Sequence, residues 1–181
     1  MSLAVATLIT SLLSMPTGGP KPEHNEFVQL FAATCMANTF SPDKLRNTLN
    51  SELTPELPPE RATPLLRGNS GTAWEVFFGK GQYAVALTQS GVCAVFARHA
   101  EISEVQEGFI RFVSSAPEPM VSRKIDSPHA GPNSEDLTTT AYAWSRPSER
   151  LEIVFTLTTS KIARDPEIQA MASVALSQSE P

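Results

Sequence analysis

The two cysteines are the residues whose spacing carries the clearest chemistry. Cys35 ends a helical apolar spacing (i, i+3, i+4, i+8) that begins at Phe27, so its thiol is predicted to face the core. Cys93 lies in residues 91–97 (GVCAVFA), whose composition predicts a buried strand. A helix packed on that strand would let a disulfide close a loop of about 58 residues, stabilising the fold by about 4 kcal/mol. The alternative is two free buried thiols that pack as small hydrophobes.

No metal or nucleophile motif accompanies the cysteines. The three histidines, His24, His99 and His129, fit no metal-binding spacing, and the cysteines lack a C-x-x-C spacing. Residues 68–71 (GNSG) superficially resemble the glycine-flanked serine of some proteases, but no partner histidine is evident, so we interpret them as a turn. The sequence therefore predicts no catalytic residue, metal site or cofactor.

The acidic residues and the glycines also form no motif that indicates a catalytic or cofactor-binding site. Glu101, Glu104 and Glu107 recur every three residues, which is typical of a solvated helix face rather than the paired carboxylates of a glycosidase. Neither a P-loop nor a dinucleotide-binding glycine motif occurs.

Aromatic and basic residues in the second half of the chain are candidates for partner binding. Sheet edges and loops commonly carry recognition, and tyrosine and tryptophan are frequent at interfaces. For the aromatic residues the alternative is ordinary core packing. The candidate partner-binding residues are Arg123, Lys124, His129, Tyr142 and Trp144.

Composition limits the class of protein. Hydrophobic residues make up 41% and charged residues 18%, which is typical of a folded domain. The net charge is −5, from 14 basic and 19 acidic residues, which argues against nucleic-acid binding. Fifteen prolines fall mostly between predicted elements, and the longest proline-free interval, 65–116, is predicted to hold the core.

The first 22 residues are predicted to be a signal-like or flexible leader. Leu3 to Leu13 is apolar but too short to span a bilayer, and it suits the hydrophobic region of a signal peptide, although no basic residue precedes it. The alternative is a leader that packs on the domain. Together with the cysteines, this segment favours an exported protein without a transmembrane span.

The elements that position these residues form a single predicted α+β domain over 23–162. Two N-terminal helices are expected, near 23–37 and from Pro42, with 54–66 as an extended or single-turn connector. A mostly antiparallel sheet of about six strands follows, a meander, then a helix, then further strands. The predicted strands are 72–78, 82–88, 91–97, 120–125, 137–145 and 150–160.

Two predictions concern the remaining segments. The helix at 103–115 should bury Val105, Phe109, Phe112 and Val113. Residues 163–181 have Ile168, Met171 and Val174 at a helical period, which predicts a last helix or a fraying tail. Residues 126–136 are predicted to be a loop.

About half of the chain, residues 25–115, resembles small uncharacterised exported proteins and lipoproteins of Gram-negative bacteria. The resemblance rests on Phe31-x-x-x-Cys35, Leu66-x-Gly68-x-x-Gly71-x-x-Trp74, the strands at 83–87 and 91–97, and the helix with Phe109. The resemblance implies a periplasmic or envelope location and paired cysteines, but it implies no particular biochemical activity.

The expected function is that of a non-enzymatic envelope protein that binds another envelope protein. It would be an accessory factor of a secretion or conjugation apparatus, or an inhibitor or immunity protein. The alternatives are a small hydrolase whose site is assembled from scattered residues and a carrier of a small ligand.

Overall fold

The computed structural model describes residues 25–126, 136–162 and 168–178. The leader, His24, His129 and most of the predicted loop lie outside these residues. The described helices are α1 (Glu26–Phe31), its π-helical continuation η1 (Ala32–Met36), α2 (Pro42–Leu49), α3 (Pro59–Leu66) and α4 (Ile102–Val113). The strands are β1 (Gly71–Phe78), β2 (Gly81–Thr88), β3 (Cys93–Ala97), β4 (Val121–Ile125), β5 (Leu137–Ser145), β6 (Leu151–Ser160) and β7 (Ala170–Gln178).

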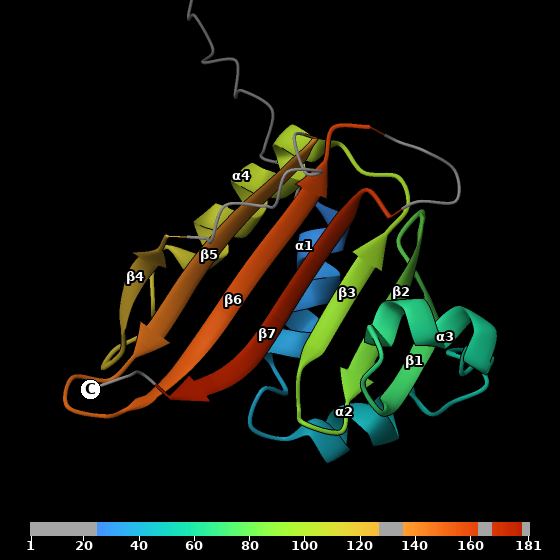
Figure 1. Cartoon of the computed structure of the whole chain (residues 1–181), viewed down its shortest axis with the longest axis horizontal. Helices are drawn as coiled ribbons and strands as arrows, with labels where there is room; N and C mark the ends of the chain where they lie inside the picture. The colour runs from blue at the N-terminus through green and yellow to red at the C-terminus, as the bar shows by residue number, and fades with distance from the viewer. Residues whose placement is uncertain (1–24, 127–135, 163–167, 179–181) are drawn as a thin grey trace, which may run out of the picture.

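The strands form one antiparallel sheet in the order β1-β2-β3-β7-β6-β5-β4, as Figure 1 shows. The predicted α+β class is therefore confirmed, as are the β1-β2-β3 meander and each of the six predicted strands. The sheet has seven strands rather than about six, because the end of the chain adds β7.

β7 corrects the prediction of a C-terminal helix or tail. It pairs with β3 on one side and β6 on the other, and so occupies the middle of the sheet. Its inward residues Ala170, Ala172 and Val174 are at most 1% exposed. Alanine has little strand preference, so the sequence pattern resembled a helix, but burial between two neighbouring strands overrides that local preference.

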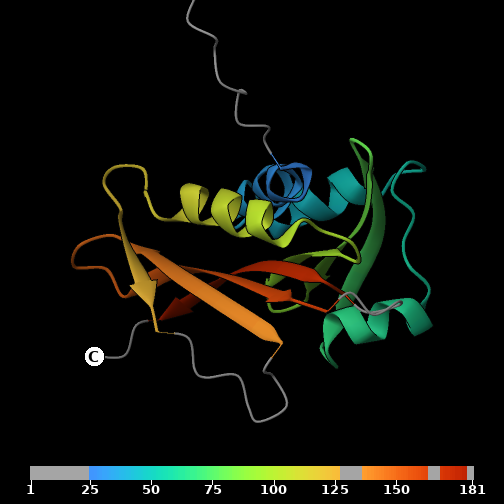
Figure 2. The ribbon, with the colours of Figure 1, turned by 90° about the horizontal axis from the view of Figure 1, so that it is seen from above.

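Helices lie on both faces of the sheet, but unequally (Figure 2). On the face that we call the helix-covered face, α1, η1, α2 and α4 bury the main core, which includes Trp74, Phe31, Phe109 and Phe155. On the opposite face, α3 packs on β1 and β2 and forms a smaller cluster around Phe96. No helix of the described chain lies over β4, β5 and β6 on that second face, which we call the open face.

Two local predictions need correction. Residues 59–66 form the eight-residue helix α3 rather than an extended or single-turn connector. Pro59 occupies the first turn, where its missing N–H costs nothing, and Pro64 is tolerated inside this short helix. On α4, Val105, Phe109 and Val113 are fully buried as predicted, but Phe112 is 39% exposed because it lies at the flank of the apolar stripe.

Candidate functional site

A disulfide joins the helical layer to the sheet. Cys35 in η1 and Cys93 at the start of β3 are bonded, with their Cα atoms 5.3 Å apart. The two residues are 0% and 3% exposed, so solvent has almost no access to the bond. The predicted pairing is thereby confirmed, and the interpretation as free thiols is wrong.

The position of the disulfide follows from the local structure. α1 is capped at its N-terminus by Asn25, whose side chain accepts a hydrogen bond from the N–H of Val28 at 3.3 Å. The helix continues into η1, which contacts β3 and β7 and carries Cys35 over them. Because Cys93 is paired with Val174 of β7, the bond lies over the centre of the sheet.

β4 is the outermost strand at the end of the sheet opposite β1, and it holds two of the candidate binding residues. Arg123 and Lys124 are both exposed, and adjacent strand residues point to opposite faces. The exposed side chain of Val121 lies on the same face as that of Arg123. β4 therefore presents one cation on each face of its edge.

Arg123 also spans three strands on the open face. Its Nη2 donates to both carboxylate oxygens of Glu152 in β6, at 2.8 and 3.0 Å. Between them, Ala143 of β5 is paired with Arg123 and is 0% exposed. The aliphatic stem of the arginine thus covers β5, while its guanidinium neutralises a carboxylate that is almost buried.

Arg123→Ala is expected to lower the free energy of unfolding by about 2 kcal/mol, because it leaves the Glu152 carboxylate without its cation. The value lies below that of a fully buried pair because the arginine side chain is 54% exposed. Urea denaturation measures the change. The double variant Arg123→Gln/Glu152→Gln removes both charges and should recover most of the stability; an equal loss in both variants would contradict the argument.

The two aromatic candidates are mainly structural. Trp144 donates its indole N–H to the carbonyl of Val113 at 2.6 Å and packs edge-on against Phe155, with ring centroids 4.6 Å apart. Tyr142 is half-buried and is paired in register with Lys124. The structure therefore brings Lys124 and Tyr142 side by side on one face, leaves Arg123 on the opposite face of β4, and places Trp144 against α4.

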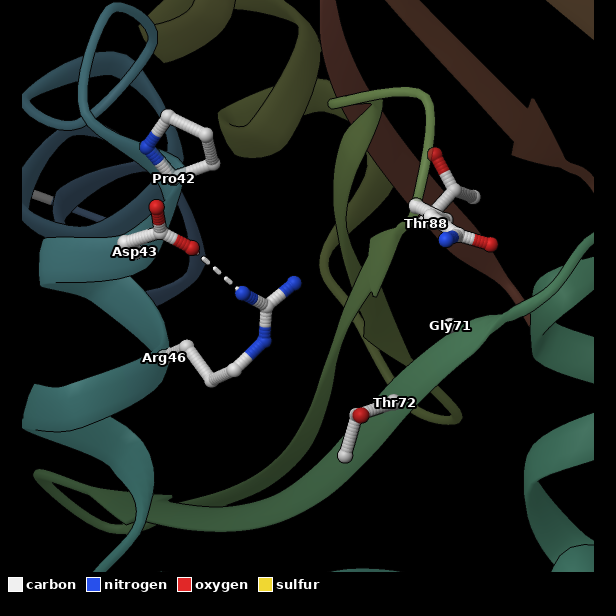
Figure 3. A pocket seen from close by; sticks show the side chains of 7 residues that line it. Pro42, Asp43, Arg46, Gly71, Thr72 and Thr88 are labelled. Atoms are coloured by element: carbon white, nitrogen blue, oxygen red, sulfur yellow. Dashed lines mark hydrogen bonds and ion pairs between the residues drawn. The ribbon is translucent and has the colours of Figure 1, made fainter.

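A cavity of about 560 Å³ lies between α2 and the ends of β1 and β2. Its lining residues are Pro42, Asp43, Arg46, Gly71, Thr72, Thr88 and Gln89. Figure 3 shows the Arg46 guanidinium extending from α2 toward β1, and Asp43 accepts a hydrogen bond from it at 2.6 Å. The cavity combines a cation with neutral polar groups, but its cation is already paired within the same helix.

Sequence reasoning missed Arg46 because a three-residue spacing of Asp and Arg is common on exposed helices. Only the approach of α2 to β1 places the pair beside a cavity, and no local pattern predicts that approach.

A second polar cluster joins α1 to the β1–β2 hairpin. The Glu26 carboxylate accepts hydrogen bonds from the N–H of Lys80 at 3.0 and 3.2 Å. Burial, reinforced by the negative charge of Glu26 and a hydrogen bond to it, raises the pKa of Tyr83 above its ordinary value. The shift favours the protonated phenol, and the cluster holds the hairpin against α1.

Other kinds of site were sought in the described part of the chain. Residues 25–126, 136–162 and 168–178 contain no group of three or more His, Cys, Asp or Glu side chains that is placed to hold a metal ion. Within the same ranges, none of the helices has the length and apolar character that crossing a membrane requires. The predicted turn at 68–71 is present, with Gly68 at φ +79°.

Comparison of the chain with known protein families, with curated proteins and with solved structures finds no match.

Proposed function

We propose that this chain is an exported envelope protein that acts by binding another protein and catalyses no reaction. The observation that carries the proposal is the exposed β4 edge, where Lys124 has no described ion pair and Arg123, paired with Glu152, is still 54% exposed, on a protein whose net charge is −5. An edge strand offers unpaired backbone groups to a partner, and nearby charges select which partner docks. The protein would serve as an accessory factor of a secretion or conjugation apparatus, or as an inhibitor or immunity protein, each of which acts by binding another protein.

Export is supported by two independent features. The buried Cys35–Cys93 disulfide belongs to a class of bond that forms and persists in oxidising compartments. The apolar stretch from Leu3 to Leu13 has the length of a signal-peptide hydrophobic region. Both features fit a protein that folds in the bacterial periplasm.

Export is tested by fusing residues 1–25 to a phosphatase that lacks its own signal and is active only outside the cytoplasm. We expect phosphatase activity in the periplasmic fraction. The matched control replaces Leu8 and Leu12 with arginine, which interrupts the apolar stretch, and should abolish that activity. Fusion protein that stays inactive in the cytoplasm would contradict the proposal of export.

Partner binding is tested by chemical cross-linking in intact cells, purification of the full chain and mass spectrometry. We expect a specific envelope protein to be recovered with the wild type. Recovery of no specific protein, under conditions that preserve weak complexes, would contradict the proposed function.

A further inference from the structure

The two edge strands of the sheet, β1 and β4, differ in whether another segment of the chain bonds to their outer side. Along β1, the outer edge is occupied by the preceding segment: the N–H of Leu57 donates to the carbonyl of Ala73 at 2.8 Å, and the N–H of Glu75 donates to that of Pro55 at 3.0 Å. Along β4, no described segment pairs with the outer edge. In an antiparallel pair, alternate residues direct their N–H and C=O groups away from the neighbouring strand. β4 therefore retains a row of backbone groups able to bond an added strand.

The charges at this edge indicate what that strand must carry. The guanidinium of Arg123 uses one nitrogen for Glu152 and is still 54% exposed, so other donors face solvent. The exposed ammonium of Lys124 has no described ion pair. A second copy of the chain paired through β4 would bring the two Lys124 ammoniums, neither of which has a described ion pair, to the same edge, which like-charge repulsion opposes. An acidic strand is the complementary occupant.

Building on the proposed function, we infer that the partner contributes an extended acidic segment that adds to β4 as an eighth, antiparallel strand. The direction is that of all six strand pairs in the sheet. Adjacent residues of the segment point to opposite faces, so two consecutive acidic residues meet Lys124 and Arg123 in that order. Two positions later an apolar residue meets Val121, whose side chain shares a face with Arg123 and is 53% exposed. The sequence motif expected of the partner segment is therefore two acidic residues, then any residue, then an apolar residue.

The probe is a capped peptide, Thr-Thr-Glu-Glu-Thr-Val-Thr, titrated into the isotopically labelled full chain and followed by NMR. We expect shift changes centred on β4 and on the outer half of β5. Lys124→Glu should weaken binding about tenfold or more, because it places like charges opposite each other. Lys44→Glu makes the same change of charge on α2 and should leave affinity within about twofold. Equal effects of the two variants would overturn the inference.

Two further measurements separate strand addition from general attraction to acidic peptides. The double variant Arg123→Gln/Glu152→Gln removes the guanidinium without leaving a buried carboxylate, and it should also weaken binding about fivefold or more. A peptide methylated at alternate backbone nitrogens keeps its charge but loses its ladder donors. We expect one of the two methylation patterns to abolish binding. Binding that survives both patterns would overturn the inference.

The inference and the proposed function fail in distinguishable ways. A photo-crosslinking residue is placed at Val121 or, as a control, at Leu53, which is 85% exposed and lies beyond α2. Capture of an envelope protein from position 121, through an acidic segment, supports both. Capture of a specific partner from position 53 alone would leave the proposed function standing and overturn the assignment of β4. Recovery of no partner from either position or by chemical cross-linking would overturn both.

Discussion

Replacing Cys35 and Cys93 together with alanine is expected to lower the free energy of unfolding by about 4 kcal/mol. The bond joins residues 58 positions apart, and opening so long a loop returns much conformational entropy to the unfolded chain. This is a large share of the stability of an ordinary domain, which is about 5–15 kcal/mol. Urea denaturation followed by the fluorescence of the tryptophans measures the loss.

Reduced wild-type protein is the matched control for the double alanine variant. Because both cysteines are almost inaccessible, the reductant must be present while the protein unfolds. The reduced protein and the variant should unfold at similar urea concentrations, both well below the oxidised wild type. If the variant lost less than about 1 kcal/mol, the disulfide would not be a principal source of stability.

Val174→Asp is expected to prevent folding, or to lower the free energy of unfolding by more than about 4 kcal/mol. Val174 is 1% exposed, next to Cys93 of β3 and Phe155 of β6, and a carboxylate there has no cation to pair with among its described neighbours. Circular dichroism and urea denaturation report the outcome.

Leu176→Asp provides the control on the same strand and the same face. Leu176 is 43% exposed, so its carboxylate would remain hydrated and the loss should stay below about 1.5 kcal/mol. A Val174→Asp protein as stable as Leu176→Asp would mean that β7 is dispensable, as the sequence pattern of a fraying tail suggested.

The sequence was most informative where local pattern and tertiary position agree. β2 alternates Tyr83, Val85 and Leu87 with Ala84 and Ala86, and in the structure the larger residues face the main core while the alanines face α3. The disulfide was predictable for the same reason. A helix face and a buried strand each carried one cysteine, and packing of one element on the other allowed the bond, although two free buried thiols fitted the same patterns.

The features that escaped prediction depend on strand order. β7 is rich in small residues whose local preference is not for strands, and only its place between β3 and β6 makes it one. The Arg123–Glu152 pair joins residues 29 positions apart, and it exists because β5 lies between β4 and β6. Of the candidate site, the sequence therefore indicated the basic edge but not the buried carboxylate beneath it.

The place of β7 also sets the order in which the molecule can be completed. A ribosome delivers the chain from its N-terminus, so β7 emerges after the other six described strands. Until then β1–β3 and β4–β6 are two separate three-stranded halves with no direct pairing between them. Both cysteines precede residue 97 and belong to the first half, whereas the sheet closes only when its central strand arrives. The pairing that joins the two halves, β3 with β7 and β7 with β6, therefore forms only after both halves of the sheet have been made.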